Sequence, residues 1–263
     1  MRSRHVRLVV AALLLVLSAG VVQRLHLLAG NDSTVVPADQ IDGRYHASTT
    51  TSVAGNAPTT TTIGTVPAPG VYEYATKGED SVDALNGAHH TYPATTTITV
   101  TPTACGVRQR WDVLVQRWEE WERCTAGSGI SEPSRTNFDQ FFGQSQTDVS
   151  LCTGAARPLA AAATVTWTKV CTIGSRASTY VGLVIGTEQQ TVGSSTVETL
   201  HVRISITDDT PSDRQQIDTW YLTGTDLVVA QTSTVTTSNK TQVGTVHYAE
   251  AYSIRLMSIV PRI

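Results

Sequence analysis

Apolar and polar residues alternate strictly along two segments of this chain, and this periodicity restricts the folds that the chain can adopt. Leu200, Val202, Ile204 and Ile206 alternate with polar or charged residues, and residues 246–256 repeat the pattern over a longer stretch. A period of two places successive side chains on opposite faces of a β-strand. The 41 threonines among 263 residues favour strands too, because β-branched side chains suit helix interiors poorly. The chain is therefore expected to be mainly β.

Further strand patterns follow one another between residues 95 and 230. Thr95–Val100 and Val165–Val170 are rich in β-branched residues, and Tyr180–Thr187 is apolar throughout, as in a strand buried on both faces. Trp220–Leu222 and Leu227–Ala230 flank a turn that contains glycine. Short connections indicate an antiparallel sheet, and the lack of alternating helical patterns argues against a Rossmann or α/β-barrel fold.

Residues 107–123 fit two different structures. Their apolar residues recur at helical spacing, but the segment also folds back as a hairpin that places Trp111 opposite Trp118 and Cys105 opposite Cys124. A helix would hold these two cysteines about 28 Å apart, too far for a disulfide. We favour the hairpin, although its central residues make a poor two-residue turn.

The four cysteines, Cys105, Cys124, Cys152 and Cys171, are expected to form two disulfides. Four cysteines allow three connectivities, and we favour Cys105–Cys124 and Cys152–Cys171 because each pair is 19 positions apart and would join neighbouring strands. A zinc site competes with this interpretation, but the sequence has no C-x-x-C motif and no close Cys/His spacing. Disulfides persist in oxidising compartments outside the cytoplasm.

Residues 1–30 have the pattern of an export signal, with basic residues before the apolar run Leu8–Val22. This run is short of the roughly 20 residues that cross a membrane, and extending it to Leu28 supplies the length. We favour an uncleaved signal-anchor helix over a cleaved signal peptide. An uncleaved N-terminal helix would hold the protein on the extracytoplasmic face of the cell membrane. A cleaved signal peptide would give a secreted protein.

The remainder of the chain divides by composition into two parts. Residues 31–70 are rich in Thr, Ser and Pro and are expected to form a disordered linker, because they contain too few large apolar residues to form a core. Residues 71–263 carry the strand patterns and are expected to form one extracytoplasmic β-domain.

Composition and motifs exclude several classes of function. A net charge of −3 argues against a nucleic-acid partner. The sequence has no P-loop, dinucleotide-binding, H-E-x-x-H or G-x-S-x-G motif, so we expect no enzymatic activity, no catalytic or metal site and no cofactor. His89–His90 is expected in a solvated turn, because adjacent strand residues point in opposite directions and cannot chelate one metal together.

Glu250 is the most informative single residue, because it shares the apolar face of its strand with Tyr248 and Tyr252. A carboxylate on such a face is unfavourable unless it is paired or neutralised. Glu250 therefore either pairs with an arginine or a tyrosine hydroxyl, or it marks a ligand cavity in which its pKa is raised. The candidate cavity residues are Glu250, Tyr248, Tyr252 and Trp220.

Residues 70–124 contain the motifs Gly70–Tyr74, Gly78–Glu79, Tyr92–Pro93 and Cys105–Gly106, followed by Trp111, Arg117–Trp118 and Cys124. These motifs resemble those of uncharacterised exported proteins of high-GC Gram-positive bacteria. The segment from Trp220 through the Gly224 turn to the long closing strand is similar to LolA/LppX-like lipoprotein carriers. This resemblance implies a curved antiparallel sheet that forms a half-open barrel with an apolar concave face for lipid. The chain departs from those carriers because no lipidated cysteine follows its apolar run.

The sequence thus predicts a non-enzymatic cell-envelope protein that binds a hydrophobic ligand in a β-sheet cavity. The alternative is a structural or protein-interaction module displayed on a flexible stalk. A sizeable apolar cavity would favour the first function, and a tightly packed interior would favour the second.

Overall fold

The computed structural model describes residues 33–49, 65–84, 87–208, 214–241 and 244–263. These residues contain the helix α2 (Ala38–Thr49) and a sheet of 14 strands. The strands are β1 (Gly70–Val82), β2 (Ala88–Thr91), β3 (Thr95–Pro102), β4 (Gly106–Leu114), β5 (Arg117–Ala126), β6 (Gly129–Phe141), β7 (Gln144–Gly154), β8 (Arg157–Pro158), β9 (Thr166–Ile173), β10 (Arg176–Val192), β11 (Ser195–Asp208), β12 (Arg214–Leu222), β13 (Val228–Thr241) and β14 (Gly244–Leu256).

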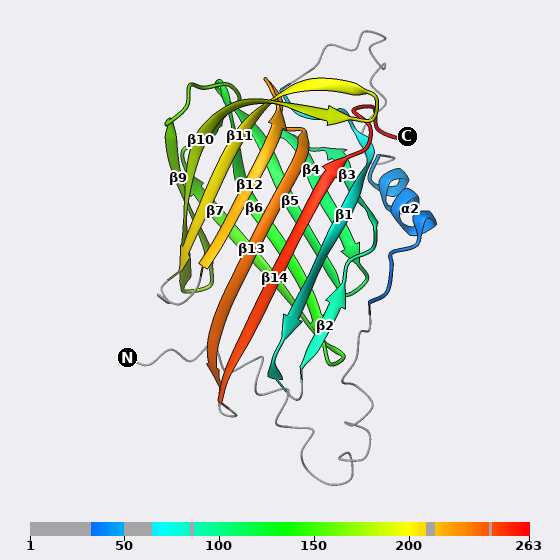
Figure 1. Ribbon diagram of the computed structural model, residues 1–263, viewed down its shortest axis with the longest axis vertical. Coiled ribbons are helices and arrows are strands. Elements are labelled where there is room, and N and C mark those ends of the chain that lie inside the picture. The colour runs from blue at the N-terminus through cyan, green and yellow to red at the C-terminus, as the bar shows by residue number, and fades with distance from the viewer. Residues whose placement is uncertain (1–32, 50–64, 85–86, 209–213, 242–243) are drawn as a thin grey trace.

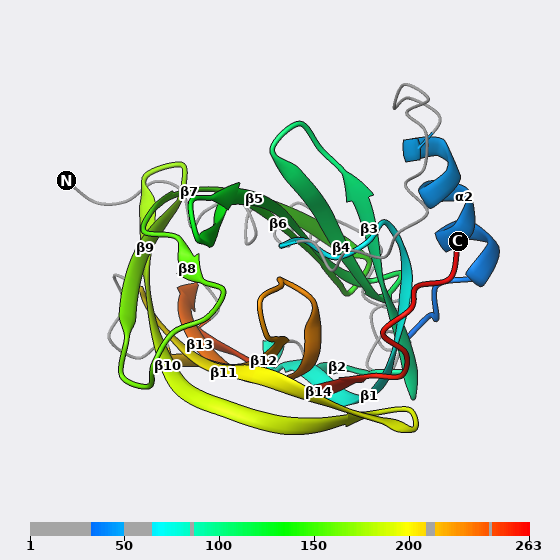
Figure 2. The same ribbon diagram turned by 90° about the horizontal axis from the view of Figure 1, so that it is seen from above.

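Twelve of these strands close into an antiparallel barrel (Figures 1 and 2), and β2 and β8 pair only with β1 and β6. The closing contact joins β14 to β1, from the pair Tyr74–Leu256 to the pair Val82–Tyr248. The mainly β fold is confirmed, but the half-open barrel is wrong. Closure gives the first and last strands hydrogen-bond partners that an open sheet edge would lack.

The predicted alternation holds along the strands, and its apolar face points into the barrel. On β14 the even-numbered residues from Glu250 to Leu256 are buried, whereas the odd-numbered residues between them are exposed. On β11, Leu200 and Val202 are fully buried. The prediction for Tyr180–Thr187 is wrong in one respect. Val181 is 42% exposed, because the outer face of this barrel wall meets solvent.

Residues 107–123 form the hairpin β4–β5 and not a helix. The register differs by one residue from the prediction, so Trp111 lies opposite Glu119 and not opposite Trp118. The cause is a β-bulge between Asp112 and Leu114, which adds a residue to one strand and shifts the pairs beyond it. Trp118 consequently lies on the outer face, where it stacks on Phe138.

Both disulfides have the favoured connectivity. Cys105, which immediately precedes β4, is bonded to Cys124 of β5, and Cys152–Cys171 joins β7 to β9, with Cα–Cα distances of 4.8 and 4.0 Å. Two disulfides agree with an oxidising compartment.

The prediction of a linker over residues 31–70 needs correction, because α2 covers Ala38–Thr49. Its buried Ile41 and Tyr45 pack against Val71 of β1, and Arg44 forms a 2.9 Å ion pair with Asp112 of β4. Residues 50–64 lie outside the described part of the chain, as does the predicted signal peptide or signal anchor over residues 1–30. No helix among the described residues has the length and hydropathy to span a membrane.

The turn between β12 and β13 folds back into the barrel (Figure 2). Its residues Thr225, Asp226 and Leu227 are buried, unlike those of a typical solvated hairpin turn. The backbone N–H of Asp226 donates to the carbonyl oxygen of Thr65 at 3.0 Å, and that of Gly224 donates to Leu159 at 3.3 Å. These contacts hold the turn inside and bring the Asp226 carboxylate to the interior side chains described next.

Candidate functional site

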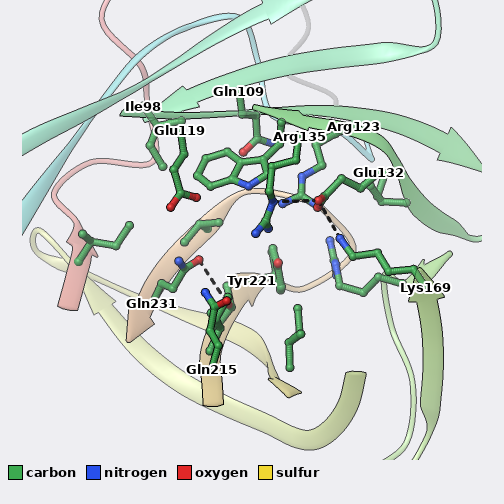
Figure 3. A pocket seen from close by; sticks show the side chains of 18 of the residues that line it. Ile98, Gln109, Glu119, Arg123, Glu132, Arg135, Lys169, Gln215, Tyr221 and Gln231 are labelled. Carbon is green, nitrogen blue, oxygen red and sulfur yellow. Dashed lines mark hydrogen bonds and ion pairs between the residues drawn. The ribbon is translucent and has the colours of Figure 1, made fainter. Parts of the chain in front are cut away.

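The barrel encloses a cavity of about 50 Å³ (Figure 3). This volume holds a few water molecules or a small ligand group, and it is far smaller than the pockets that take drug-sized ligands. Aromatic and aliphatic side chains supply part of the wall, among them Trp121, Trp167 and Tyr221. Charged side chains also line it, namely the cationic Arg123, Arg135, Arg157 and Lys169 and the acidic Glu119 and Glu132.

Three of the four cations surround Glu132. Its carboxylate forms ion pairs with Lys169 Nζ at 2.7 Å and Arg135 Nε at 3.2 Å, and it also accepts a hydrogen bond from Arg123 Nη1. In Figure 3 the four side chains converge on one side of the cavity. We call these residues, together with Arg157 and Asp226, the cationic cluster.

Asp226 holds the fourth cation. Arg157 Nη2 donates to its Oδ1, and Gln109 Nε2 donates to its Oδ2 at 2.8 Å. The Arg157 guanidinium also lies over the ring of Tyr221, 3.6 Å from its centroid. Arg123 Nε is 3.6 Å from the same carboxylate, so Asp226 links two arginines that come from different parts of the chain.

A β-bulge in β6 explains how both Glu132 and Arg135 reach the interior although three positions separate them. Ser131 pairs with Cys124 and Ser134 pairs with Glu122, so β6 carries one more residue than β5 over this stretch. The segment contains Pro133, which has no backbone N–H for the ladder and is tolerated at bulges. Without the extra residue, one of the two side chains would point outward.

The cationic cluster has two more positive than negative side chains, and burial together with these charges shifts the pKa values of its members. Burial lowers the pKa of Lys169 to about 8, with Arg135 and Arg123 acting in the same direction. Burial alone would raise the pKa of Glu132, but Arg123, Lys169 and Arg135 outweigh it and hold this pKa below its usual range. Glu132 is therefore ionised at neutral pH and stabilises its three partners.

A second group of charged side chains surrounds Arg117. Along β5, Arg117 and Arg123 of the cationic cluster lie on opposite sides of Glu119. Arg117 contacts Glu119, and it pairs with Glu250 and Asp139 at 3.2 Å each. Tyr92 donates a 2.5 Å hydrogen bond to Glu250. We call Arg117, Glu119, Asp139, Glu250 and the neighbouring Asp80 the acidic cluster.

Burial dominates the electrostatics of the acidic cluster. It raises the pKa of Glu250 to about 7, although Arg117 acts in the opposite direction. It likewise raises the pKa of Asp139 to about 6, again against the effect of Arg117. One arginine cannot compensate for several buried carboxylates, so two of them retain protons at a higher pH than they would in water.

Of the four candidate cavity residues, Tyr252 lines the cavity, whereas Glu250, Tyr248 and Trp220 are not among its lining residues. Glu250, Tyr248 and Tyr252 are on the inner face of β14, and Glu250 belongs to the acidic cluster. Glu250 pairs with both an arginine and a tyrosine hydroxyl, as the first alternative predicts, and its pKa is raised, as the second predicts, although it does not line the cavity. Trp220 does not join them. It stacks on His201 with ring centroids 4.2 Å apart. Its neighbours Thr219 and Tyr221 line the cavity, so Trp220 lies on the opposite face of β12.

Sequence reasoning missed the polar interior almost entirely. His90, expected in a solvated turn, is fully buried on β2 with Nδ1 2.7 Å from Asp80 Oδ1. Arg123, Arg135 and Lys169 also escaped notice, because a period-two pattern does not say which face is inside when both faces carry charges. Strand β5 did contain a signal of a polar interior face. Its odd-numbered residues combine charges with a large aromatic side chain, namely Arg117, Glu119, Trp121 and Arg123.

Two groups of described residues place three potential metal ligands within 4.8 Å of one another. One contains Glu122 with Cys105 and Cys124, and the other contains Glu132 with Cys152 and Cys171. In each group both sulfurs belong to a disulfide, so neither offers the thiolate that a metal site of this kind requires.

Comparison of the chain with protein-family models, with curated proteins and with solved structures gave no match.

Proposed function

We propose that this chain is an exported, non-enzymatic binding protein of the cell envelope that encloses a small polar ligand in its barrel. The observation that carries the proposal is the interior cavity, whose wall combines four cationic side chains with aromatic rings. Placing several charges in a core destabilises a domain that needs only to fold. Convergent polar groups in an otherwise apolar pocket are typical of ligand sites.

The cavity supports a small polar ligand in place of the hydrophobic one expected from sequence. An acyl chain needs a long apolar cavity, whereas about 50 Å³ is enclosed here beside Arg123, Arg157 and Lys169. Desolvating these cations against hydrocarbon would be unfavourable, since a lipid tail offers them no hydrogen-bond acceptor.

Export is supported by the two disulfides and by the basic and apolar pattern of residues 1–30. In this proposal the N-terminal segment either anchors the barrel at the outer face of the cell membrane or is removed during secretion. Cell fractionation with an antibody against the barrel distinguishes the two locations.

A thermal-shift screen tests the binding function. The purified chain is heated with a panel of small metabolites that includes acidic, basic, neutral polar and apolar compounds, and a bound compound raises the melting temperature. Ile98→Phe enlarges a buried side chain of the cavity wall, and Val149→Phe, at a site 55% exposed, is its matched control. We expect Ile98→Phe to abolish the shift and Val149→Phe to retain it. A panel without any hit, or a hit that survives Ile98→Phe, contradicts the proposal.

A further inference from the structure

The cavity wall contains hydrogen-bond donors that have nothing to donate to. Trp121 Nε1, Arg123 Nε and Arg157 Nε are buried, and none of the three has a hydrogen-bond partner among the described residues. All three side chains line the cavity. Trp121 is only 6% exposed and Arg157 only 5%, so bulk water does not satisfy these groups. Buried donors without partners are rare and call for an acceptor.

The charges of the same residues specify what kind of acceptor fits. Within the cationic cluster, Glu132 and Asp226 share four cations as ion-pair partners, so the cluster carries two more positive than negative charges. Glu119 also lines the cavity, but it contacts Arg117 of the acidic cluster. An anionic acceptor would satisfy the free N–H groups and reduce the surplus of positive charge at once.

The remaining wall indicates that the anion is part of an organic molecule. Ile98, Trp167 and Ile254 are buried and line the same cavity. Inorganic phosphate or sulfate would leave these apolar surfaces without a partner, whereas a short hydrocarbon body would contact them.

Resting on the binding function proposed above, we propose that the ligand is a small organic acid whose carboxylate accepts hydrogen bonds from Trp121, Arg123 and Arg157. Asp226 supports this assignment from within the chain. Its carboxylate, carried in by the β12–β13 turn, already contacts both arginines, so the site demonstrably accommodates a carboxylate group. The ligand supplies a second one to the three donors, none of which hydrogen-bonds to Asp226, although Arg123 Nε lies 3.6 Å from its Oδ2.

Calorimetric titration of the full chain with butyrate and with its neutral isostere butyramide tests the proposal, with sodium chloride holding the ionic strength constant. Butyrate should bind about tenfold or more tightly than butyramide, because hydrogen bonds to a charged acceptor are the stronger ones. Inorganic phosphate, as the third ligand, should bind more weakly than butyrate. Equal affinity for butyrate and butyramide would contradict the assignment of a carboxylate ligand, but not the proposed binding function. Phosphate binding as tight as that of butyrate would contradict the assignment of an organic ligand.

Two tryptophan variants make the test specific. Trp121→Phe deletes an N–H without a partner and should weaken butyrate about tenfold but butyramide less, because the amide oxygen is an uncharged acceptor. Trp111→Phe deletes an N–H that already donates to Thr96 Oγ1 at 2.9 Å and should change neither affinity. Asp226→Asn removes the internal carboxylate and should tighten butyrate about tenfold, which gives an independent readout if an aromatic variant folds poorly. Unchanged butyrate affinity in both Trp121→Phe and Asp226→Asn contradicts the assignment.

Discussion

The Tyr92 hydroxyl group donates a 2.5 Å hydrogen bond to Glu250 although the two residues are 158 positions apart. Tyr92 follows β2, Glu250 is on β14, and β1 pairs with both strands at the place where the barrel closes. The hydrogen bond therefore lies inside the closing seam, next to the pairing of Arg117 with Glu250. The strand pairing that closes the barrel therefore also buries Glu250 of the acidic cluster.

Glu250→Gln should flatten the pH dependence of stability. Burial raises the pKa of Glu250 to about 7 from an ordinary 4.5, so the folded state retains a proton that the unfolded chain releases. The stabilisation is fully present below pH 4.5 and is lost as the pH rises through 7, by up to about 3 kcal/mol. Urea unfolding of both proteins from pH 4.5 to 8 should show a smaller loss for the variant.

Glu79→Gln is the matched control for this pH profile, because Glu79 is exposed on β1 near the same seam. The free energy of unfolding of Glu79→Gln should fall with rising pH as much as that of the natural chain. Parallel profiles for the natural chain and Glu250→Gln would show that Glu250 does not titrate in this range.

Trp111→Phe should destabilise the protein more than Trp121→Phe does. Both changes remove part of a buried ring, but only the first breaks an existing hydrogen bond, the one from Trp111 Nε1 to Thr96. We expect a difference of about 1 kcal/mol in the free energy of unfolding, measured with urea. Equal losses would mean that Trp121 Nε1 has a hydrogen-bond acceptor in the ligand-free protein.

Mild reduction should open Cys105–Cys124 before Cys152–Cys171. Cys105 is exposed, whereas Cys152 and Cys171 are 8% and 3% exposed, so a thiol reagent reaches the first bridge more readily. Alkylation followed by peptide mass spectrometry identifies the order. Loss of either bridge should lower the free energy of unfolding by about 3 kcal/mol, since each closes a loop of similar length. Simultaneous labelling of all four cysteines would contradict the predicted order.

Ile41→Ala should show that α2 is part of the folded unit. Ile41 is 5% exposed and packs with Tyr45 against Val71, so truncation leaves a cavity and should cost about 2–4 kcal/mol. Val35→Ala is the control, because Val35 is 58% exposed and should change stability by less than about 0.5 kcal/mol. Equal effects of the two changes would mean that the helix contributes nothing to the stability of the barrel.

The sequence predicted the strands better than their closure. Period-two patterns correctly identified the inward residues of β11 and β14, because apolar side chains there occupy one face only. The contact of β1 with β14 joins the two ends of the barrel, and no local pattern indicates whether such ends meet. The one-residue error in the β4–β5 register came from a bulge, which turn sequences alone do not reveal.

The candidate site was predictable only in part. Glu250 stood out because it was one acidic residue among apolar neighbours, and the structure buries it with Arg117 and Tyr92. Lys169 is followed by the apolar Val170, and Arg135 lies between Ser134 and Thr136, so the immediate neighbours do not mark either cation as interior. Arg157 reaches the site from β8, a two-residue strand that pairs only with β6, and Asp226 reaches it from an inward-folded turn.

The bound ligand can be identified by mass spectrometry of the small molecules that are released when the chain, purified from its own host, is unfolded. We expect one organic acid of low molecular mass, present at close to one molecule per barrel and depleted in Arg157→Gln. Release of a lipid or a cation at that stoichiometry, or of no small molecule from the host-derived protein, would contradict this expectation.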